Sequence, residues 1–243
     1  MLFNAATSPV RLAVYGPEIS VPARGVGLWS AGYKSCIIAA DATPVFLKQN
    51  RGDRSWGEIV HGCHGIVVVG FEPTREGANG DAESLCQWAK KHKVPMLAID
   101  NGMLAMNASF GGLTYFDLPR ELPEALQHRH PPEPGLRHAI NVQLDTRLCD
   151  IYGEGEIVVN SEHRAGIQRL ANGFRIGGTA LDGVIEAIET TGDAWWAMGV
   201  QWQPASGSAS GLDIQVFRAL IDAVKAKTPS LAVPTKVPLA VAG

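Results

Sequence analysis

The residues best placed to do chemistry surround Asp100, which directly follows the apolar run Val94–Ile99. A strand that ends in a tight turn and continues as a helix exposes the turn residue at the amino end of that helix. If a helix begins there, its dipole favours negative charge, so we expect Asp100 to be a carboxylate anion. The simplest alternative is that Asp100 only caps the helix.

Two groups of potential metal ligands carry little weight. His61, Cys63 and His64 lie close together, but they lead directly into an apolar run and have no distant partner motif. His128 and His130 fall in a proline-rich connection, which is typical of a solvated loop. The sequence therefore predicts no metal and no other cofactor.

The amino-acid composition limits the classes of protein to which the chain can belong. The chain has 243 residues, of which 46% are hydrophobic and 19% charged, and its net charge is −3. This net charge gives no sign of the basic surface that binds nucleic acid. No apolar run reaches the roughly 18–20 residues that span a bilayer. Four scattered cysteines without paired spacing indicate reduced thiols, and no secretion signal is recognisable. We expect a cytoplasmic protein that binds neither nucleic acid nor membrane.

Apolar runs alternate with helical patterns through the first half of the chain, which favours an α/β fold with a largely parallel sheet and helices on both faces. The predicted strands are Arg11–Tyr15, Thr43–Leu47, Gly65–Gly70 and Val94–Ile99, and the predicted helices are Tyr33–Ala42, Arg54–Cys63 and Ala82–His92.

The second half has more closely spaced strands. Leu118–His138 is predicted to be a surface connection, and the Asp182-Gly183 turn indicates antiparallel pairing. Residues 1–227 are expected to form a single domain and residues 228–243 a disordered tail. The predicted strands are His138–Leu144, Glu156–Asn160, Phe174–Ala180, Val184–Glu189 and Trp195–Trp202, and Leu212–Lys227 is the last helix.

The segment Pro95–Leu118 resembles the nucleophile elbow of class I glutamine amidotransferases, of the γ-glutamyl-γ-aminobutyrate hydrolase type. In that family a strand leads into Gly-Ile-Cys-Arg-Gly-Met-Gln and a helix that ends in Asn-x-x-x-Gly-Gly. Three further blocks agree in order and spacing. They are Val158–Arg164 (VVNSEHR), Asp182–Ala187 (DGVIEA) and Gly199–Ala205 (GVQWQPA).

The resemblance implies a three-layer, flavodoxin-like sandwich with a mixed, mainly parallel sheet. It also implies that the catalytic Cys, His and Glu of the family are replaced, because their positions fall on Asp100, Gln203 and Ala205. Gly70 and Phe71 occupy the family's oxyanion turn. Loss of nucleophile or base alone costs on the order of 10⁶ in rate in related triads, so amide hydrolysis by the family route is not expected.

The degenerate site is expected to bind a small polar or amine ligand, or to serve a regulatory or structural role, with a homodimer as one arrangement. The alternative is a hydrolase in which Asp100 is the nucleophile and His163 activates water. The predicted ligand-binding residues are Gly70, Phe71, Asp100, Asn101, His163 and Gln203.

Overall fold

The computed structural model describes residues 10–17, 29–49, 51–70, 80–129 and 135–228. Their strands form one sheet in the order β2-β1-β3-β4-β11-β10-β9-β6-β7, and β8 pairs with β10 and β5 beside this path. The strands are β1 (Val10–Tyr15), β2 (Ala42–Phe46), β3 (Gly65–Val69), β4 (Met96–Ile99), β5 (Leu113–Tyr115), β6 (Arg137–Val142), β7 (Gly155–Asn160), β8 (Gly166–Arg169), β9 (Phe174–Ala180), β10 (Ile185–Thr190) and β11 (Ala197–Val200).

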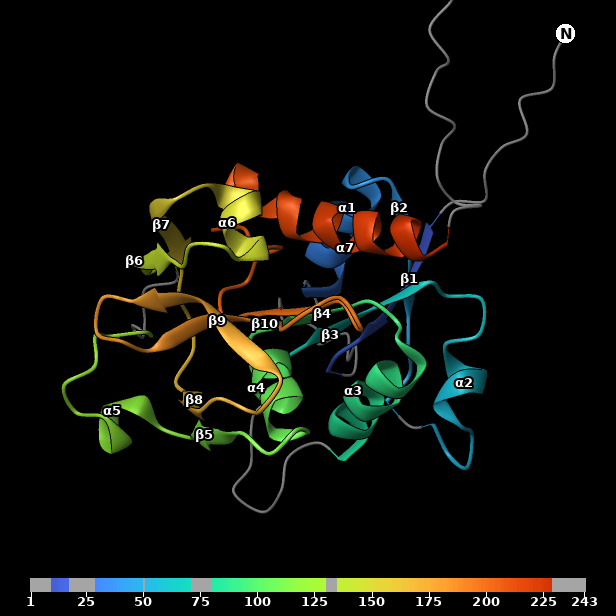
Figure 1. Ribbon diagram of the computed structural model, residues 1–243, viewed down its shortest axis with the longest axis horizontal. Coiled ribbons are helices and arrows are strands. Elements are labelled where there is room, and N and C mark those ends of the chain that lie inside the picture. Colours follow the sequence, from blue (N-terminus) through green and yellow to red (C-terminus); the bar gives the residue numbers. More distant parts are fainter. Residues whose placement is uncertain (1–9, 18–28, 50, 71–79, 130–134, 229–243) are drawn as a thin grey trace, which may run out of the picture.

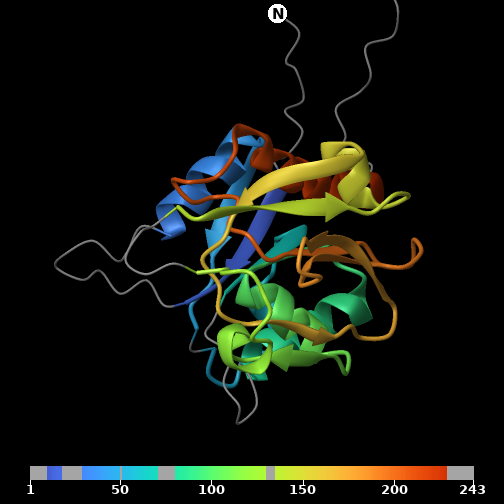
Figure 2. The same ribbon diagram turned by 90° about the vertical axis from the view of Figure 1, so that its left-hand side faces the viewer.

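Helices cover both faces of the sheet. Figures 1 and 2 show α1 and α7 on one face and α3 and α4 on the other. The helices are α1 (Trp29–Ala39), α2 (Trp56–Ile59), α3 (Gly80–His92), α4 (Asn101–Ala108), α5 (Leu118–Glu121), α6 (Arg147–Tyr152) and α7 (Ile214–Lys227), preceded by the 3₁₀ turn Gly211–Asp213. The predicted α/β fold with a mixed sheet is confirmed.

The central strands are apolar throughout because both of their faces are buried. In β4, Leu97 and Ile99 belong to the core beneath α1 and α7, whereas Met96 and Ala98 belong to the core beneath α3 and α4. β3 alternates between the two cores in the same way. Every residue of these two strands is buried, so they hold the residues at their carboxyl ends rigidly.

Parallel pairing joins β2, β1, β3, β4 and β11, while the remaining described pairs are antiparallel. The antiparallel part therefore takes a larger share of the sheet than the sequence predicted. The Asp182-Gly183 turn does join antiparallel β9 and β10, as expected, and Gly183 has a φ of 87° there.

Some elements differ from the prediction. The helical stretch expected at Arg54–Cys63 is only the short α2, because its capped start at Ser55 is followed by a turn that closes at Gly62, with a φ of 73°. The connection at Leu118–His138 contains α5. Three other short elements, β5, β8 and α6, lack the length that a periodic pattern needs to be recognised.

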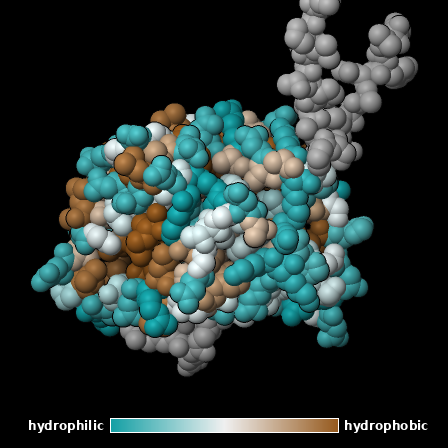
Figure 3. All heavy atoms as spheres, in the orientation of Figure 1, coloured by the Kyte–Doolittle hydropathy of each residue, from teal (hydrophilic) through white to brown (hydrophobic). Residues whose placement is uncertain are grey.

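On the face seen in Figure 3, hydrophobic side chains gather toward the end of the sheet that carries β6, β7 and β9. Exposed large side chains of this half include Leu144, Val158 and Leu181. In the part of the chain that is described, no helix is both long and apolar enough to cross a membrane.

The turn between β4 and α4 is the most constrained part of the fold. Asp100 has a φ of 56° and a ψ of −128°, a backbone conformation that side chains with a Cβ rarely adopt. The next turn of α4 packs directly on β3, since a Cβ on Gly102 would lie 2.4 Å from the main-chain oxygen of Val68. This is the strained strand-to-helix elbow that the sequence pattern predicted.

Backbone strain at Asp100 can be measured with two substitutions. Asp100→Ala and Asp100→Gly remove the same carboxylate, but only glycine adopts this φ without a steric penalty, which is about 1–3 kcal/mol per strained residue. The greater freedom of glycine in the unfolded chain offsets up to about 1 kcal/mol of this gain. We expect the glycine variant to unfold at the higher urea concentration. A glycine variant less stable than the alanine variant would show that the elbow is not strained.

The contact of α4 with β3 gives a second prediction. Gly102→Ala should lower the free energy of unfolding by about 1–3 kcal/mol, because the added methyl group overlaps a main-chain atom that cannot rotate away. Gly80→Ala is the matched control, since a Cβ at this helix position meets no atom within 4 Å. Urea denaturation of both variants checks this, and equal stabilities for the two would contradict it.

Candidate functional site

Strand register brings the predicted site residues together. β3 and β11 flank β4 in parallel, with Val69 and Val200 both paired with Ile99. The next residues along these strands, Gly70, Asp100 and Gln201, therefore leave the sheet side by side at its carboxyl edge, where α/β folds bind their ligands.

Two glutamine side chains hold the Asp100 carboxylate. The Nε2 atom of Gln201 donates to Oδ1 at 3.1 Å, and the Nε2 atom of Gln203 donates to Oδ2 at 3.1 Å. The prediction that Asp100 faces Gln203 is confirmed. Asp100 makes no side-chain capping bond to α4, so the simple N-cap interpretation is wrong.

Asn160, at the end of β7, fixes the position of Gln203. Its Oδ1 atom accepts from the main-chain nitrogen of Gln203 at 2.9 Å, and its Nδ2 atom donates to the main-chain oxygen of Gln203 at 3.0 Å. The same amide nitrogen donates to Ser206. Asn160 is itself buried, so this clamp is rigid. The sequence pattern included Asn160, but nothing in it indicated this role.

Ala205 places a methyl group where the family resemblance puts the orienting carboxylate. The adjoining loop packs tightly on α1, since a Cβ on Gly32 would lie 2.2 Å from the main-chain oxygen of Ala205. Tyr33 of the same helix is buried, and burial, together with the nearby charge of Asp100, raises the pKa of its phenol well above the usual value. Tyr33 thus adds a neutral hydroxyl to this region, which the sequence did not indicate.

Gly70 allows the close approach that the elbow needs. A Cβ on Gly70 would lie 2.8 Å from Oδ2 of Asp100 and 3.2 Å from the main-chain nitrogen of Asn101. The side-chain Oδ1 of Asn101 is buried and accepts no hydrogen bond from the described residues. Phe71, also predicted to line the site, lies outside the described residues.

His163 is buried rather than exposed on a turn, with 4% of its surface accessible. Its Nδ1 atom bonds to the main-chain oxygen of Ala165 at 2.9 Å, and its Nε2 atom lies 3.3 Å from Oε1 of Glu186. Burial by itself lowers the pKa of His163, but Glu186, the Ala165 carbonyl and the charge of Asp100 together raise it.

Two further histidines lie beside Glu186, and the sequence did not predict either of them as a site residue. His128 was expected in a solvated loop, but it is buried, with Nδ1 lying 3.3 Å from Oε1 of Glu186. His138 of β6 contributes Nε2 at 3.5 Å from the same oxygen. Burial alone would raise the pKa of Glu186, but the histidines lower it to about 2. Glu186 joins this cluster to the elbow, because its main-chain oxygen accepts from the nitrogen of Gln201 at 2.7 Å.

The three ligand-type residues noted near β3 do not form a comparable group. His61 is exposed, and the Nδ1 atom of His64 accepts a hydrogen bond from the main-chain nitrogen of Arg11 at 3.0 Å. Cys63 is partly buried, which raises the pKa of its thiol. His64 therefore joins β1 to the start of β3 and has a structural role.

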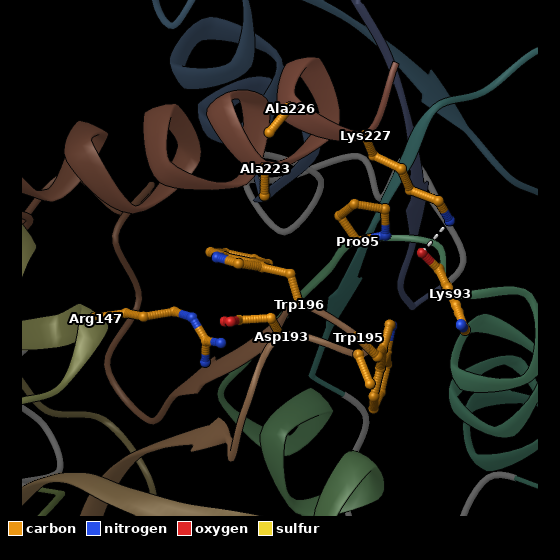
Figure 4. Close-up of a pocket in the computed structure, with 10 residues that line it drawn as sticks. Lys93, Pro95, Arg147, Asp193, Trp195, Trp196, Ala223, Ala226 and Lys227 are labelled. Atoms are coloured by element: carbon orange, nitrogen blue, oxygen red, sulfur yellow. Dashed lines mark hydrogen bonds between the residues drawn. The ribbon is translucent and has the colours of Figure 1, made fainter. Parts of the chain in front are cut away.

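The larger of two described cavities, about 490 Å³, lies far from Asp100, at the amino ends of β4 and β11. Figure 4 shows Trp196 beneath α7, between Arg147 and Lys227. The ammonium group of Lys227 donates to the main-chain oxygens of His92 and Lys93. The other cavity, about 290 Å³, is lined by His128 and His163 and so adjoins the histidine cluster.

Relatives of this chain resemble it over most of its length. The chain is 30% identical over 249 residues to a glutamine amidotransferase-like protein of Rickettsia prowazekii, covering 79% of this chain and 88% of that protein. It is 29% identical over 217 residues to a protein of Mycobacterium tuberculosis named as a glutamine amidotransferase, covering 81% of this chain and 68% of the relative.

Two solved structures share the fold. The first is a GMP synthase subunit from Thermoplasma acidophilum, with a TM-score of 0.64, 14% identity, and coverage of 89% of this chain and 95% of that one. The second is the CTPS glutaminase domain of Trypanosoma brucei, with a TM-score of 0.61, 17% identity, and coverage of 89% and 94%. The Peptidase C26 family model matches residues 17–205, and the chain belongs to this glutamine amidotransferase-like family.

Proposed function

We propose that this chain is a non-hydrolysing member of its family and that its elbow binds a small amine instead of a γ-glutamyl amide. The observation that carries the proposal is the Asp100 carboxylate on the elbow, held by the side chains of Gln201 and Gln203. In an amidase this position would carry a nucleophile with a base beside it.

The replaced residues remove each step of amide hydrolysis by the family route. A neighbouring base must take the proton of the thiol, the resulting thiolate must attack the carbonyl, and the protonated base must then give this proton to the leaving amine. A carboxylate at a helix amino end is a stabilised anion, and the amide of Gln203 takes up no proton at neutral pH. Asp100 also brings its own negative charge to the place where an oxyanion would develop.

The alternative, in which Asp100 forms an ester that His163 helps to hydrolyse, has weak support. A general base needs a ring nitrogen directed at the attacking water. Nδ1 of His163 bonds to the main chain of Ala165, and Nε2 is directed at Glu186. Both nitrogens therefore lie beside acceptors other than Asp100.

The acceptors at the elbow favour a ligand that donates hydrogen bonds. Besides the Asp100 carboxylate, Oδ1 of Asn101 and Oε1 of Gln201 are buried and accept no hydrogen bond from the described residues. Buried acceptors of this kind are costly unless a donor pairs with them. A protonated amine supplies several donors and a charge opposite to that of Asp100.

The first test is catalytic. We expect no release of ammonia or amine from glutamine or γ-glutamyl amines above background, because nucleophile and base are both replaced. The control is the triple variant Asp100→Cys, Gln203→His and Ala205→Glu, compared with Asp100→Cys alone. A correctly placed base contributes about 10²-fold or more, so the triple variant should be faster by this order. Turnover by the natural chain that Asp100→Ala abolishes would overturn the proposal.

The second test concerns the ligand. Isothermal calorimetry should show that small primary amines bind more tightly than glutamate, and that Asp100→Asn weakens amine binding by about tenfold or more, since a charged hydrogen bond is worth about 1.5–3 kcal/mol. Tighter binding of glutamate than of every amine tried, with Asp100→Asn making no difference, would contradict an amine site.

A further inference from the structure

We propose that His128, His138, His163 and Glu186 form a binding site for one divalent transition-metal ion of the zinc type. These are the described residues in which three or more potential ligands come together, and their ligand atoms all lie within 4.8 Å of one another. The site does not depend on the proposed function of the elbow.

The spacing of the ligand atoms fits tetrahedral coordination. Oε1 of Glu186 lies 3.3 Å from Nδ1 of His128, 3.5 Å from Nε2 of His138 and 3.3 Å from Nε2 of His163. Ligands about 2.0–2.1 Å from a tetrahedral zinc ion are roughly 3.3–3.4 Å apart. The three nitrogens thus surround the carboxylate oxygen at the separations that a shared ion would produce, and small side-chain rotations would bring the nitrogens closer together.

The chemistry of these atoms also calls for a cation. The outer nitrogen of each ring faces a pure acceptor and so must carry the hydrogen. These acceptors are the Asp182 carboxylate for His128, at 2.9 Å, and the main-chain oxygens of Ala139 and Ala165 for the other two rings, at 3.1 and 2.9 Å. In a neutral imidazole the inner nitrogen is then an acceptor. Three acceptors consequently point at a carboxylate, which is itself an acceptor.

A proton on one ring, for example His163, would let that ring donate to Glu186 but would leave the inner nitrogens of the other two rings facing an acceptor. None of the three inner nitrogens, and neither oxygen of Glu186, makes a hydrogen bond of acceptable geometry with any described residue. Protonating all three rings would place three positive charges in a cluster whose ring centroids lie 4.7, 4.8 and 6.4 Å apart. A buried cluster of this kind is costly, whereas one ion would satisfy all four ligands at once.

The groups around the four ligands hold them in position. Each ring has its second nitrogen fixed by an acceptor, which orients metal-binding histidines and sets their tautomer. Asp182 is itself held by the main-chain nitrogens of Leu126 and Val184, at 2.6 and 3.1 Å. A divalent ion would balance the charges of Glu186 and Asp182.

The ligand set also indicates which ion fits and what it does. Three imidazoles and one carboxylate suit zinc, whereas calcium and magnesium prefer oxygen ligands. The four side chains are at most 8% exposed, and four protein ligands leave no open position, as in structural zinc sites. The ion would fasten the connection carrying His128 to β6, β10 and the turn after β7.

The test uses the full chain without a polyhistidine tag, stripped by a chelator and titrated with Zn²⁺ in a calorimeter. We expect one Zn²⁺ per chain, confirmed by elemental analysis, and a higher unfolding temperature with the metal than without it. Co²⁺ in place of Zn²⁺ should give the strong visible absorption of a four-coordinate site. A stripped, folded chain that binds no Zn²⁺ would overturn the proposal.

Variants locate the site. His163→Gln and Glu186→Gln should each weaken Zn²⁺ binding by more than about 100-fold, and Asp182→Asn, which removes only an outer partner, by about 10–100-fold. The control His61→Gln/Cys63→Ser should bind as the natural chain does. If His163→Gln and Glu186→Gln fail to fold, the difference in Zn²⁺ affinity between Asp182→Asn and the control still tests the proposal. Loss of binding in the control, or unchanged binding in Asp182→Asn, would refute this site.

Discussion

The tight turn after β4 is the constraint on which the rest of the site depends. β4 is buried on both faces between β3 and β11, and α4 packs so closely on β3 that Gly102 and Gly70 have no room for a Cβ. The turn must therefore reverse the chain within one residue, and Asp100 takes up the unusual φ. Its side chain is then directed into the space beside β11, where Gln201 and Gln203 meet it.

The same packing explains how an aspartate can occupy this turn. The conformation of the elbow is set by the backbone and the residues packed on it. A carboxylate in this position needs donors, and two amide side chains supply them. Asp100 and Gln203 therefore fit one another, since Nε2 of Gln203 donates to Oδ2 of Asp100 at 3.1 Å. Such complementarity supports our proposal that the site binds a ligand and does not hydrolyse one.

Much of this arrangement could be predicted from the sequence, because long apolar runs and the blocks around Asp100 and Gln203 are local patterns. The histidine cluster could not be predicted, since its members are separated by up to 58 positions, from His128 to Glu186, and are brought together by the pairing of β6 with β7 and β9 and of β9 with β10. A proline-rich segment has no hydrophobic periodicity that would reveal burial. The prediction that His128 lies in a solvated loop was therefore wrong. Short elements such as α6 were missed for the same lack of pattern.

The central claim is that Asp100 is a held anion and not a nucleophile. In a nucleophilic mechanism the Asp100 carboxylate would attack the γ-glutamyl carbonyl, expel the amine and form a mixed anhydride, and water that opens this anhydride at the aspartyl carbonyl would leave a solvent oxygen in Asp100. Incubation of the chain with γ-glutamyl amides in ¹⁸O-labelled water, followed by mass spectrometry of the peptide containing Asp100, measures this directly. The account predicts an unchanged peptide mass and no released amine over many hours, whereas incorporation of ¹⁸O or release of amine that depends on substrate and on Asp100 would contradict it.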